Sequence, residues 1–277
     1  MKQQKYCTRK IKNSVKHSYI KYTKNDRSVF DMDYEIMMNG NVKIGMHAPD
    51  FEADTTMGKR TLSDYRGKWL VLFSHPGDFT PVCTTEFIAF SKANTYFQNL
   101  NTELLGLSID SNSSHLAWLY DIYIKTGIKV PFPVIADRNG AIARKYGMIS
   151  NDVSTTETVR NVFIIDDKGI IRLILVYPMN VGRAIAEILR AIEALQMYDK
   201  TKLSTPANWM PDQPLVVGAP KTFDELEARM QEIEKNKNGM NWYLSFKNPE
   251  EEIMVKNLEN KEQLVKIIEE KNKNGKY

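Results

Sequence analysis

Cys83 is the residue of this sequence that is best placed to act as a nucleophile. It follows residues 69–74, a short run of β-branched and aromatic residues that predicts a buried strand. Thr80 is a candidate N-cap, and Pro81 the first residue, of a helix that comes next. Cys83 then lies near the third helical position, where free backbone N–H groups and the positive end of the helix dipole favour a thiolate. The apolar residues that recur at helical spacing are Phe87, Phe90, Ala93, Tyr96 and Phe97.

Two polar residues lie one helical turn from Cys83. Thr80 is three residues before it, so the threonine hydroxyl can reach the sulfur. Glu86 is three residues after it, and an unpaired carboxylate there would oppose a thiolate. We therefore expect Glu86 to be paired with a cation. The alternative interpretation is that Cys83 is a buried structural cysteine and Thr80 only an N-cap.

The residues around Cys83 form the pattern Pro76-x-x-x-Thr80-x-x-Cys83, within the sequence FSHPGDFTPVCTTEF. This pattern resembles the active-site signature of the peroxiredoxins, in particular of their one-cysteine branch. The chain is also similar to the long thioredoxin peroxidases of archaea and bacteria. The resemblance spans roughly residues 42–245 and fades towards the C-terminus. It is supported by the segments TVRNVFIID (158–166), YPM-x-x-GR (177–183) and PANW (206–209).

The resemblance implies a thiol peroxidase that reduces hydrogen peroxide and organic hydroperoxides to water and alcohols. In such an enzyme Cys83 attacks one peroxide oxygen and becomes a sulfenic acid. Thr80 is then expected to hydrogen-bond the thiolate and the peroxide, and Pro76 to shield the site from water. Arg160 matches the arginine that stabilises the thiolate and binds the peroxide. It is also the most economical partner for Glu86.

Two further residues carry an expectation and an alternative. Arg183 is expected to be a second cation near the substrate, and otherwise a surface residue. His75 matches a histidine of the one-cysteine branch, and it either hydrogen-bonds the site or simply finishes the strand. Without the resemblance, Arg160 would be interpreted as a solvated charge at a strand end and Pro76 as an ordinary loop proline.

A sulfenic acid at Cys83 must be reduced by a thiol. Cys7 is the only internal candidate, and residues 242–246, where long archaeal relatives carry C-terminal cysteines, contain none. We expect Cys7 to be a free thiol and the reductant to be external, a thioredoxin-like protein or a small thiol. We expect no cofactor and no metal, because the two cysteines fit no zinc spacing and the histidines are scattered singly. The histidines are His17, His47, His75 and His115.

Charge is unevenly distributed along the 277 residues. The net charge is +4, but residues 1–36 hold nine Lys or Arg against four Asp or Glu, which leaves a balance of −1 for the remainder. A basic body is therefore excluded, and we expect no nucleic-acid partner. No apolar run approaches the length of a membrane span, so we expect no membrane partner. Two cysteines form no disulfide framework, which favours a reducing compartment, the cytoplasm.

Residues 1–41 are predicted to form a disordered basic extension. They lack amphipathic periodicity and a continuous apolar stretch, which argues against a signal peptide. The alternatives are a tail that touches a membrane or nucleic acid, an organelle transit segment, or an extension without function. Our preferred explanation is a mis-assigned start codon, because Met37 and Met38 lie just before the resemblance begins.

Strands and helices alternate between residues 42 and 197. This pattern predicts an α/β domain with a mixed central sheet and helices on both faces, compatible with the thioredoxin-like fold that the resemblance implies. The last two predicted strands form a hairpin, and Ser113 and Ser114 are expected to start the helix at 115–125. The further strands are expected at 104–110, 132–137, 160–165 and 170–177, and the other helices at 141–146 and 183–195.

Residues 198–277 form a smaller C-terminal region. Four prolines between 206 and 220 predict an extended linker, and helices are expected at 223–234 and 249–271. The resemblance implies that this region is an arm that reaches over a partner subunit in a homodimer. It leaves open whether such dimers close into a decamer.

Three other functions compete with the peroxidase. A redox sensor or holdase would respond to oxidation of Cys83, but it would make the peroxidase residues superfluous. A disulfide oxidoreductase needs a Cys-x-x-Cys partner, which Cys83 lacks. A phospholipase side activity, known for some animal one-cysteine relatives, has no supporting Gly-x-Ser-x-Gly motif.

Overall fold

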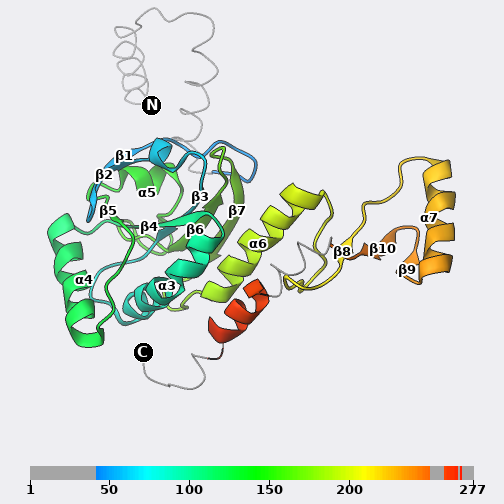
Figure 1. Ribbon diagram of the computed structural model, residues 1–277. Coiled ribbons are helices and arrows are strands. Elements are labelled where there is room, and N and C mark those ends of the chain that lie inside the picture. Colours follow the sequence, from blue (N-terminus) through cyan, green and yellow to red (C-terminus); the bar gives the residue numbers. More distant parts are fainter. Residues whose placement is uncertain (1–41, 250–258, 268, 270–277) are drawn as a thin grey trace, which may run out of the picture. The chain divides into compact units, whose positions relative to one another are not determined.

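A computed structural model of the chain describes residues 42–249, 259–267 and 269. Its main element is a seven-stranded mixed sheet in the order β2-β1-β5-β4-β3-β6-β7 (Figure 1). The central strands β3, β4 and β5 run parallel, and each outer strand is antiparallel to its inner neighbour. The strands are β1 (Glu52–Thr55), β2 (Gly58–Thr61), β3 (Trp69–Ser74), β4 (Thr102–Ser108), β5 (Val134–Ala136), β6 (Arg160–Ile165) and β7 (Ile171–Tyr177).

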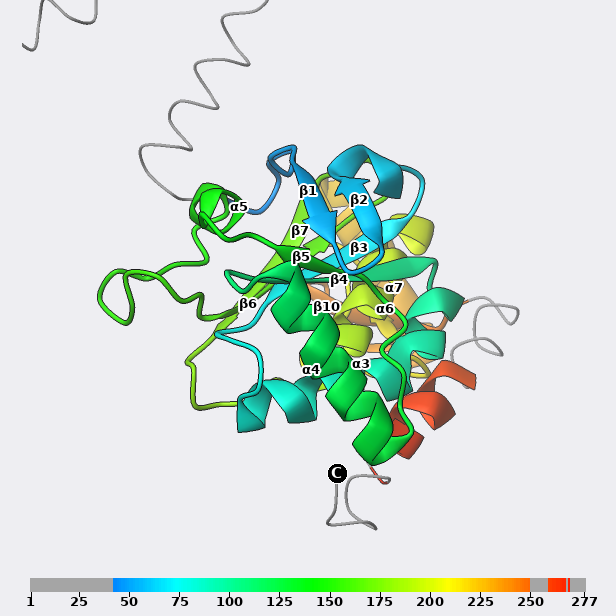
Figure 2. The same ribbon diagram turned by 90° about the vertical axis from the view of Figure 1, so that its left-hand side faces the viewer.

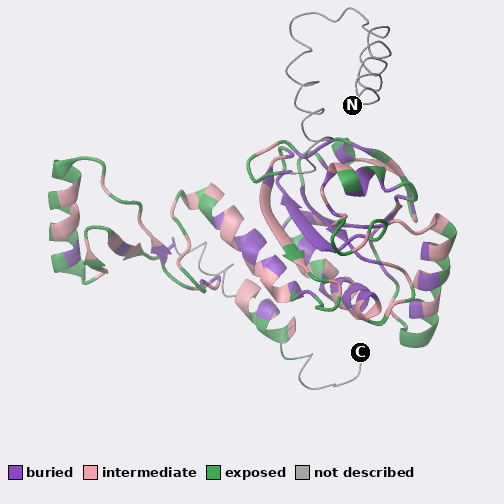
Figure 3. Ribbon diagram, turned by 180° about the vertical axis from the view of Figure 1, so that it is seen from behind, coloured by how far each residue is buried: buried purple, intermediate pink, exposed green. Residues whose placement is uncertain are grey.

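The sheet separates two apolar layers. Successive residues of a strand point to opposite faces. Val71 and Phe73 of β3 therefore pack with α3, α4 and α6, whereas Leu70 and Leu72 pack with η1 and α5. Figure 2 shows α3 and α4 on one side of the sheet and α5 on the other. Figure 3 shows the resulting buried centre of the sheet. The predicted α/β architecture with helices on both faces is confirmed. The helices are the 3-10 helix η1 (Leu62–Tyr65) and α3 (Pro81–Asn99), α4 (Asn112–Thr126), α5 (Ala141–Lys145) and α6 (Ile185–Thr201).

The strand and helix on either side of the Cys83 loop are where the sequence predicts them. β3 ends at Ser74 and α3 begins at Pro81, which makes Cys83 the third residue of the helix. Thr80 occupies the N-cap position with extended backbone angles, but its hydroxyl makes no capping bond. The hydroxyl instead donates to the carbonyl oxygen of Gly77 at 2.9 Å, because it points back into the loop. The predicted N-cap residue and first helical residue are therefore confirmed, although the side chain of Thr80 does not make the cap.

Two helices begin elsewhere than predicted. α4 begins at Asn112, because the hydroxyl of Ser111 accepts the backbone N–H of Ser114 and caps the helix; Ser113 and Ser114 lie inside it. α6 begins two residues later than predicted, because the backbone N–H of Arg183 is bound by a side chain of α3. It then continues to Thr201, six residues beyond the predicted end.

The strands β1 and β2 were not predicted. They are short and polar, with the sequences EADT and GKRT, and lack the apolar alternation that identifies a half-buried strand. The predicted hairpin of β6 and β7 is confirmed, and Gly169 in its turn has a φ of 80°, which favours glycine. The strand predicted at 104–110 is observed as β4, two residues earlier, at Thr102–Ser108. The prediction extends too far because an apolar residue, Ile109, follows the last paired residue of the strand.

Between residues 215 and 247, the C-terminal region contains an amphipathic helix and a second, three-stranded sheet in the order β8-β10-β9. The helix predicted at 223–234 is confirmed as α7. The short strands of the second sheet were not predicted. The elements are β8 (Leu215–Val216), α7 (Phe223–Asn236), β9 (Gly239–Asn241) and β10 (Leu244–Lys247).

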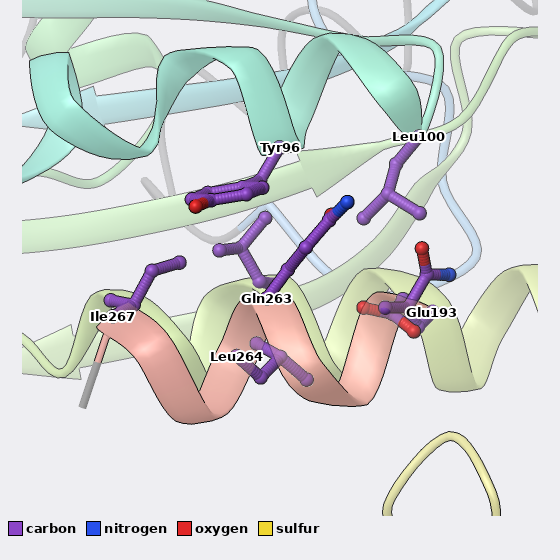
Figure 4. A pocket seen from close by; sticks show the side chains of 8 residues that line it. Tyr96, Leu100, Glu193, Gln263, Leu264 and Ile267 are labelled. Atoms are coloured by element: carbon purple, nitrogen blue, oxygen red, sulfur yellow. The ribbon is translucent and has the colours of Figure 1, made fainter. Parts of the chain in front are cut away.

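The helix predicted at 249–271 is described only at 259–267 and 269, where it is helical. Its Leu264 is buried in the same apolar layer as α3 and α6, and Ile267 packs against that layer (Figure 4). Tyr96 of α3 and Leu100, the C-cap of α3, line the other side of this contact, and the lining residues leave no space for a small molecule. The last helix thus returns to the main domain.

Some expectations concern residues outside the described ranges. Residues 1–41 are among them, so the expected basic extension, Cys7 and the paired methionines before residue 42 are not described. Within the described ranges, no helix is both long enough and apolar enough to cross a membrane.

The apolar layer around α3 predicts the effect of a core truncation. Phe87 is fully buried and its ring contacts those of Phe73, Trp118 and Phe132. We expect Phe87→Ala to lower the free energy of unfolding by about 3–5 kcal/mol. Urea unfolding followed by fluorescence measures this. The exposed control Ile44→Ala should change it by less than about 0.5 kcal/mol, and equal losses in the two variants would contradict the expectation.

Candidate active site

Cys83 is a free thiol with no exposed surface. The guanidinium of Arg160 donates from Nη1 to its Sγ at 3.3 Å. Arg160 is the first residue of β6, and β6 pairs antiparallel with β3, so β6 begins at the end of the sheet where β3 turns into the Cys83 loop. Arg160 is 2 % exposed. Its interpretation as a solvated strand-end charge is therefore wrong.

Most of the donors of Arg160 are engaged. Nε and Nη2 donate to the carbonyl oxygen of Met179 at 2.9 and 2.6 Å, and Nη1 also donates to Glu86 at 2.8 Å. A guanidinium has five N–H donors in a fixed plane. One N–H of Nη2 has no acceptor among the described residues. The group is thus held from two sides while one donor stays available beside the sulfur.

Glu86 is the buried counter-ion of two arginines. Its Oε2 accepts from Arg160 Nη1 at 2.8 Å and from Arg183 Nη2 at 2.6 Å, and its Oε1 accepts from the backbone N and Nε of Arg183. Burial works to raise the pKa of Glu86, but the charge and hydrogen bonds of Arg183, followed by the charge of Arg160, outweigh it and hold that pKa below its usual value. The predicted pairing with Arg160 is confirmed, and Arg183 adds a second partner.

Arg183 is enclosed, so the alternative of a surface residue is wrong. Its Nη1 donates to the carbonyl oxygens of Ser74 and Asn161 at 2.9 and 3.0 Å, and its guanidinium lies over the rings of Phe73 and Phe90. It is linked to Cys83 only through Glu86 and Arg160. The geometry therefore joins the end of β3, the start of β6 and the segment before α6.

Pro76 and Thr80 lie in the loop that precedes α3. Pro76 is buried and Thr80 half-buried. The expected hydrogen bond from Thr80 to Cys83 is not formed, because the hydroxyl proton is donated to Gly77. The lone pairs of that hydroxyl stay available as acceptors.

His75 continues β3 by one backbone hydrogen bond, from its N–H to the carbonyl of Leu107. Its ring is fully buried, and Nε2 bonds to Asp78 at 3.1 Å rather than to Cys83. Asp78 also bonds to Nδ1 of His115 at 2.8 Å. The sequence did not predict this cluster, because His115 lies 37 residues after Asp78 and no spacing pattern relates them. In the described part of the chain, these three groups are the one set whose donor atoms lie close enough, within 4.8 Å, to hold a metal ion.

Comparisons with known proteins agree with this geometry. Residues 44–174 match the AhpC/TSA family, and residues 194–232 match the C-terminal domain of 1-Cys peroxiredoxin. Peroxiredoxin 2 of Caldanaerobacter subterraneus subsp. tengcongensis is 57 % identical over 205 residues, which cover 74 % of this chain and 92 % of that protein. The chain belongs to the peroxiredoxin family. Peroxiredoxin 2 of Thermoplasma acidophilum is 53 % identical, over 73 % of this chain and 99 % of that protein.

Solved peroxiredoxin structures share the fold. A yeast mitochondrial 1-Cys peroxiredoxin matches with a TM-score of 0.65 and 38 % identity, covering 76 % of this chain and all of that one. A cysteine-to-serine mutant of Peroxiredoxin 6 of Arenicola marina matches with a TM-score of 0.66 and 34 % identity over the same shares. The expected thioredoxin-like fold is confirmed, and this peroxiredoxin is a thiol-dependent peroxidase, an oxidoreductase.

The depressed pKa of Glu86 makes its contribution to stability depend on pH. The pKa of Glu86 in the folded protein lies below 4.5, its usual value and the one expected in the unfolded chain. Above pH 4.5 the ionised carboxylate therefore stabilises the fold in full, and this stabilisation is lost as the pH falls through the folded pKa. We expect Glu86→Gln to cost about 3–5 kcal/mol at neutral pH, since it leaves two buried arginines unpaired. The difference from wild type should narrow below pH 4.5.

Urea unfolding of both proteins at neutral and acid pH measures the difference. Glu103 forms an exposed ion pair with Lys68 and provides the matched control, because Glu103→Gln should cost no more than about 1 kcal/mol. If Glu86→Gln lowered the free energy of unfolding by the same amount at every pH, Glu86 would not be an ionised counter-ion of the two arginines.

Proposed function

We propose that Cys83 is the peroxidatic residue of this peroxiredoxin and that it reduces hydrogen peroxide and organic hydroperoxides. The observation that carries the proposal is the contact of Arg160 with Sγ at 3.3 Å, at the first turn of α3. The thiolate attacks the terminal peroxide oxygen, the S–O bond forms and the O–O bond breaks. The leaving oxygen takes a proton and departs as water or an alcohol, and Cys83 becomes a sulfenic acid.

Arg160 and Thr80 are proposed to bind the peroxide from opposite sides. The remaining N–H of Arg160 Nη2 donates to the oxygen on which negative charge develops, as a fixed donor in a dry site. The hydroxyl of Thr80 donates its own hydrogen bond to the carbonyl oxygen of Gly77. Its lone pairs can therefore accept a hydrogen bond from the O–H of the peroxide. Pro76, buried at the start of the same loop, excludes water from the sulfur.

Glu86 and Arg183 are proposed to position Arg160 rather than to touch the substrate. Glu86 fixes the plane of the Arg160 guanidinium, and Arg183 fixes Glu86 through three hydrogen bonds. His75 was expected in the substrate site, and its ring is engaged with Asp78 instead. We assign it to the support of the loop.

An external thiol is proposed to reduce the sulfenic acid. Cys83 has no cysteine partner among the described residues. The yeast 1-Cys peroxiredoxin of similar fold is resolved through glutathione and thioredoxin systems, which supports a small thiol or a thioredoxin-like protein here. The chain holds only two cysteines, which supports a reducing compartment such as the cytoplasm.

The proposed organisation is a peroxidase domain at 42–197 and an arm at 198–277 that covers a second copy of the chain. The match of 194–232 to the C-terminal domain of 1-Cys peroxiredoxin supports it. So do the exposed apolar side chains of the arm, which need a covering surface. They include Phe223, Met240 and Tyr243.

A second apolar surface supports the assembly of dimers into a ring. It is a stripe on the outer face of α4, at positions i, i+4, i+7 and i+8, and all four side chains are exposed. These residues are Leu116, Tyr120, Tyr123 and Ile124.

The chemistry is tested by mixing reduced protein with a small excess of hydrogen peroxide in a stopped-flow instrument. Tryptophan fluorescence should change in a second-order phase that is absent in Cys83→Ser. Arg160→Lys keeps a charge but loses the planar donors, and it should slow the phase by about 100-fold or more. A wild-type rate in Cys83→Ser would exclude Cys83 as the nucleophile, and a wild-type rate in Arg160→Lys would exclude peroxide binding by the guanidinium.

The second surface is tested by measuring mass in solution. We expect Tyr120→Glu to convert an assembly larger than a dimer into dimers, because it places a charge in the middle of the α4 stripe. The control Met57→Glu, an exposed apolar residue away from α4, should leave the mass unchanged. Light scattering after size-exclusion chromatography gives the result, and an unchanged mass for Tyr120→Glu would show that the stripe is no interface.

A further inference from the structure

A buried cluster of His75, Asp78 and His115 involves the loop between β3 and α3, the loop that carries Pro76 and Thr80. None of the three side chains contacts Sγ of Cys83 in the described part of the chain. The carboxylate of Asp78 is 1 % exposed and accepts from His75 Nε2 at 3.1 Å. It also contacts Nδ1 of His115, at 2.8 Å through Oδ2 and 3.0 Å through Oδ1. The other ring nitrogen of His115 lies 3.1 Å from the carbonyl oxygen of Ile135. Both histidine rings are completely buried.

The hydrogen-bond partners fix the protons of His115. Burial works to raise the pKa of Asp78, but the hydrogen bonds from His115 and His75 outweigh it and hold that pKa well below the usual range. The carboxylate is therefore ionised and only accepts, and a carbonyl oxygen also only accepts. Each ring nitrogen of His115 therefore faces an atom that can only accept, the carboxylate of Asp78 on one side and the carbonyl oxygen of Ile135 on the other.

The hydrogen-bond partners of the His75 ring indicate a neutral imidazole in one tautomer. Nε2 carries the proton, because it faces the carboxylate of Asp78. Nδ1 has no hydrogen-bond partner among the described residues. Burial lowers the pKa of His75 more than Asp78 raises it, which agrees with an unprotonated Nδ1.

The cluster holds a strained piece of backbone. Phe79, next to Thr80, has a φ of 56°, a left-handed conformation that bulky residues rarely adopt. Such strain persists only where the surroundings impose it. The backbone N–H of Asp78 is bound by Asp110 at 3.0 Å, and Asp110 is bound by Ser108 at the end of β4. The loop is therefore fixed at Asp78 through its side chain and its backbone.

We propose that Asp78 and His115 are positioning residues of the peroxidatic site, a buried ion pair that holds the strained loop carrying Pro76 and Thr80 and fixes the tautomer of His75. The proposal rests on the proposed role of Cys83 in peroxide reduction. It is carried by the direct hydrogen bonds of Asp78 with both histidines and of His115 with Ile135.

The protonation states can be measured without reference to activity. In full-length protein labelled with ¹⁵N-histidine, NMR at neutral pH should show His115 with protons on both ring nitrogens and His75 with a proton on Nε2 only. Spectra of His75→Gln and His115→Gln assign the signals. A singly protonated His115 would overturn the proposal, whatever the peroxidase does.

The rate of reaction with peroxide then shows whether Asp78 positions the site or only stabilises the fold. Asp78→Ala removes all the side-chain contacts, and we expect the second-order rate with peroxide to fall by about 10–100-fold in the folded protein. Asp78→Asn should recover most of the rate, because an amide accepts from His75 and donates to a His115 that has lost its Nδ1 proton, a change that NMR detects. The exposed Asp121→Ala on α4 is the control.

Three outcomes decide the matter. A folded Asp78→Ala protein that unfolds at lower temperature but reacts at the wild-type rate would show a merely structural role. One equivalent of zinc in the purified wild type that is lost in Asp78→Asn would replace the ion pair by a metal site. If the NMR result holds but Cys83→Ser still reacts, the proton assignment stands and the proposed nucleophile fails.

Discussion

The charge of Glu86 is the constraint on which the rest of the site depends. Two arginines lie buried on either side of Glu86, Arg160 in contact with the sulfur, and buried cations without a counter-ion are strongly destabilising. Glu86 neutralises one of the two charges, which leaves a single positive charge beside Cys83. That charge contacts Sγ of Cys83 through Nη1 of Arg160 at 3.3 Å. The carboxylate of Glu86, which would place a negative charge near the sulfur if it stood alone, therefore holds a positive charge there.

The sheet topology brings these groups together. Because β6 is antiparallel to β3, the first residue of β6 lies where β3 ends and the chain enters the loop to α3. The segment between β7 and α6 closes the same end, where Met179 binds Arg160 and Arg183 binds Glu86. Three segments that are distant in sequence thus contribute groups to one hydrogen-bonded site: residues 74–86, the start of β6 and the segment before α6.

Local signals explain what the sequence could predict. β3 and α3 follow from a continuous apolar run and from helical spacing after Pro81, so the position of Cys83 required no tertiary information. The roles of Arg160 and Arg183 came from family resemblance, because burial of a charge depends on partners far along the chain. The contact of Asp78 with His115 had no local signal. The polar strands β1 and β2 and the end of α6 were missed because their boundaries are set by pairing and packing.

Cys83 has no exposed surface. A molecule as small as hydrogen peroxide needs less displacement of the surrounding side chains to reach its sulfur than a bulky electrophile does. The same enclosure affects the two halves of the catalytic cycle differently. In the first half, oxidation, only a small molecule has to reach Sγ, whereas in the second half, reduction, Sγ has to contact another thiol. The position of Cys83 in the first turn of α3, with no exposed surface, therefore hinders the second half far more than the first.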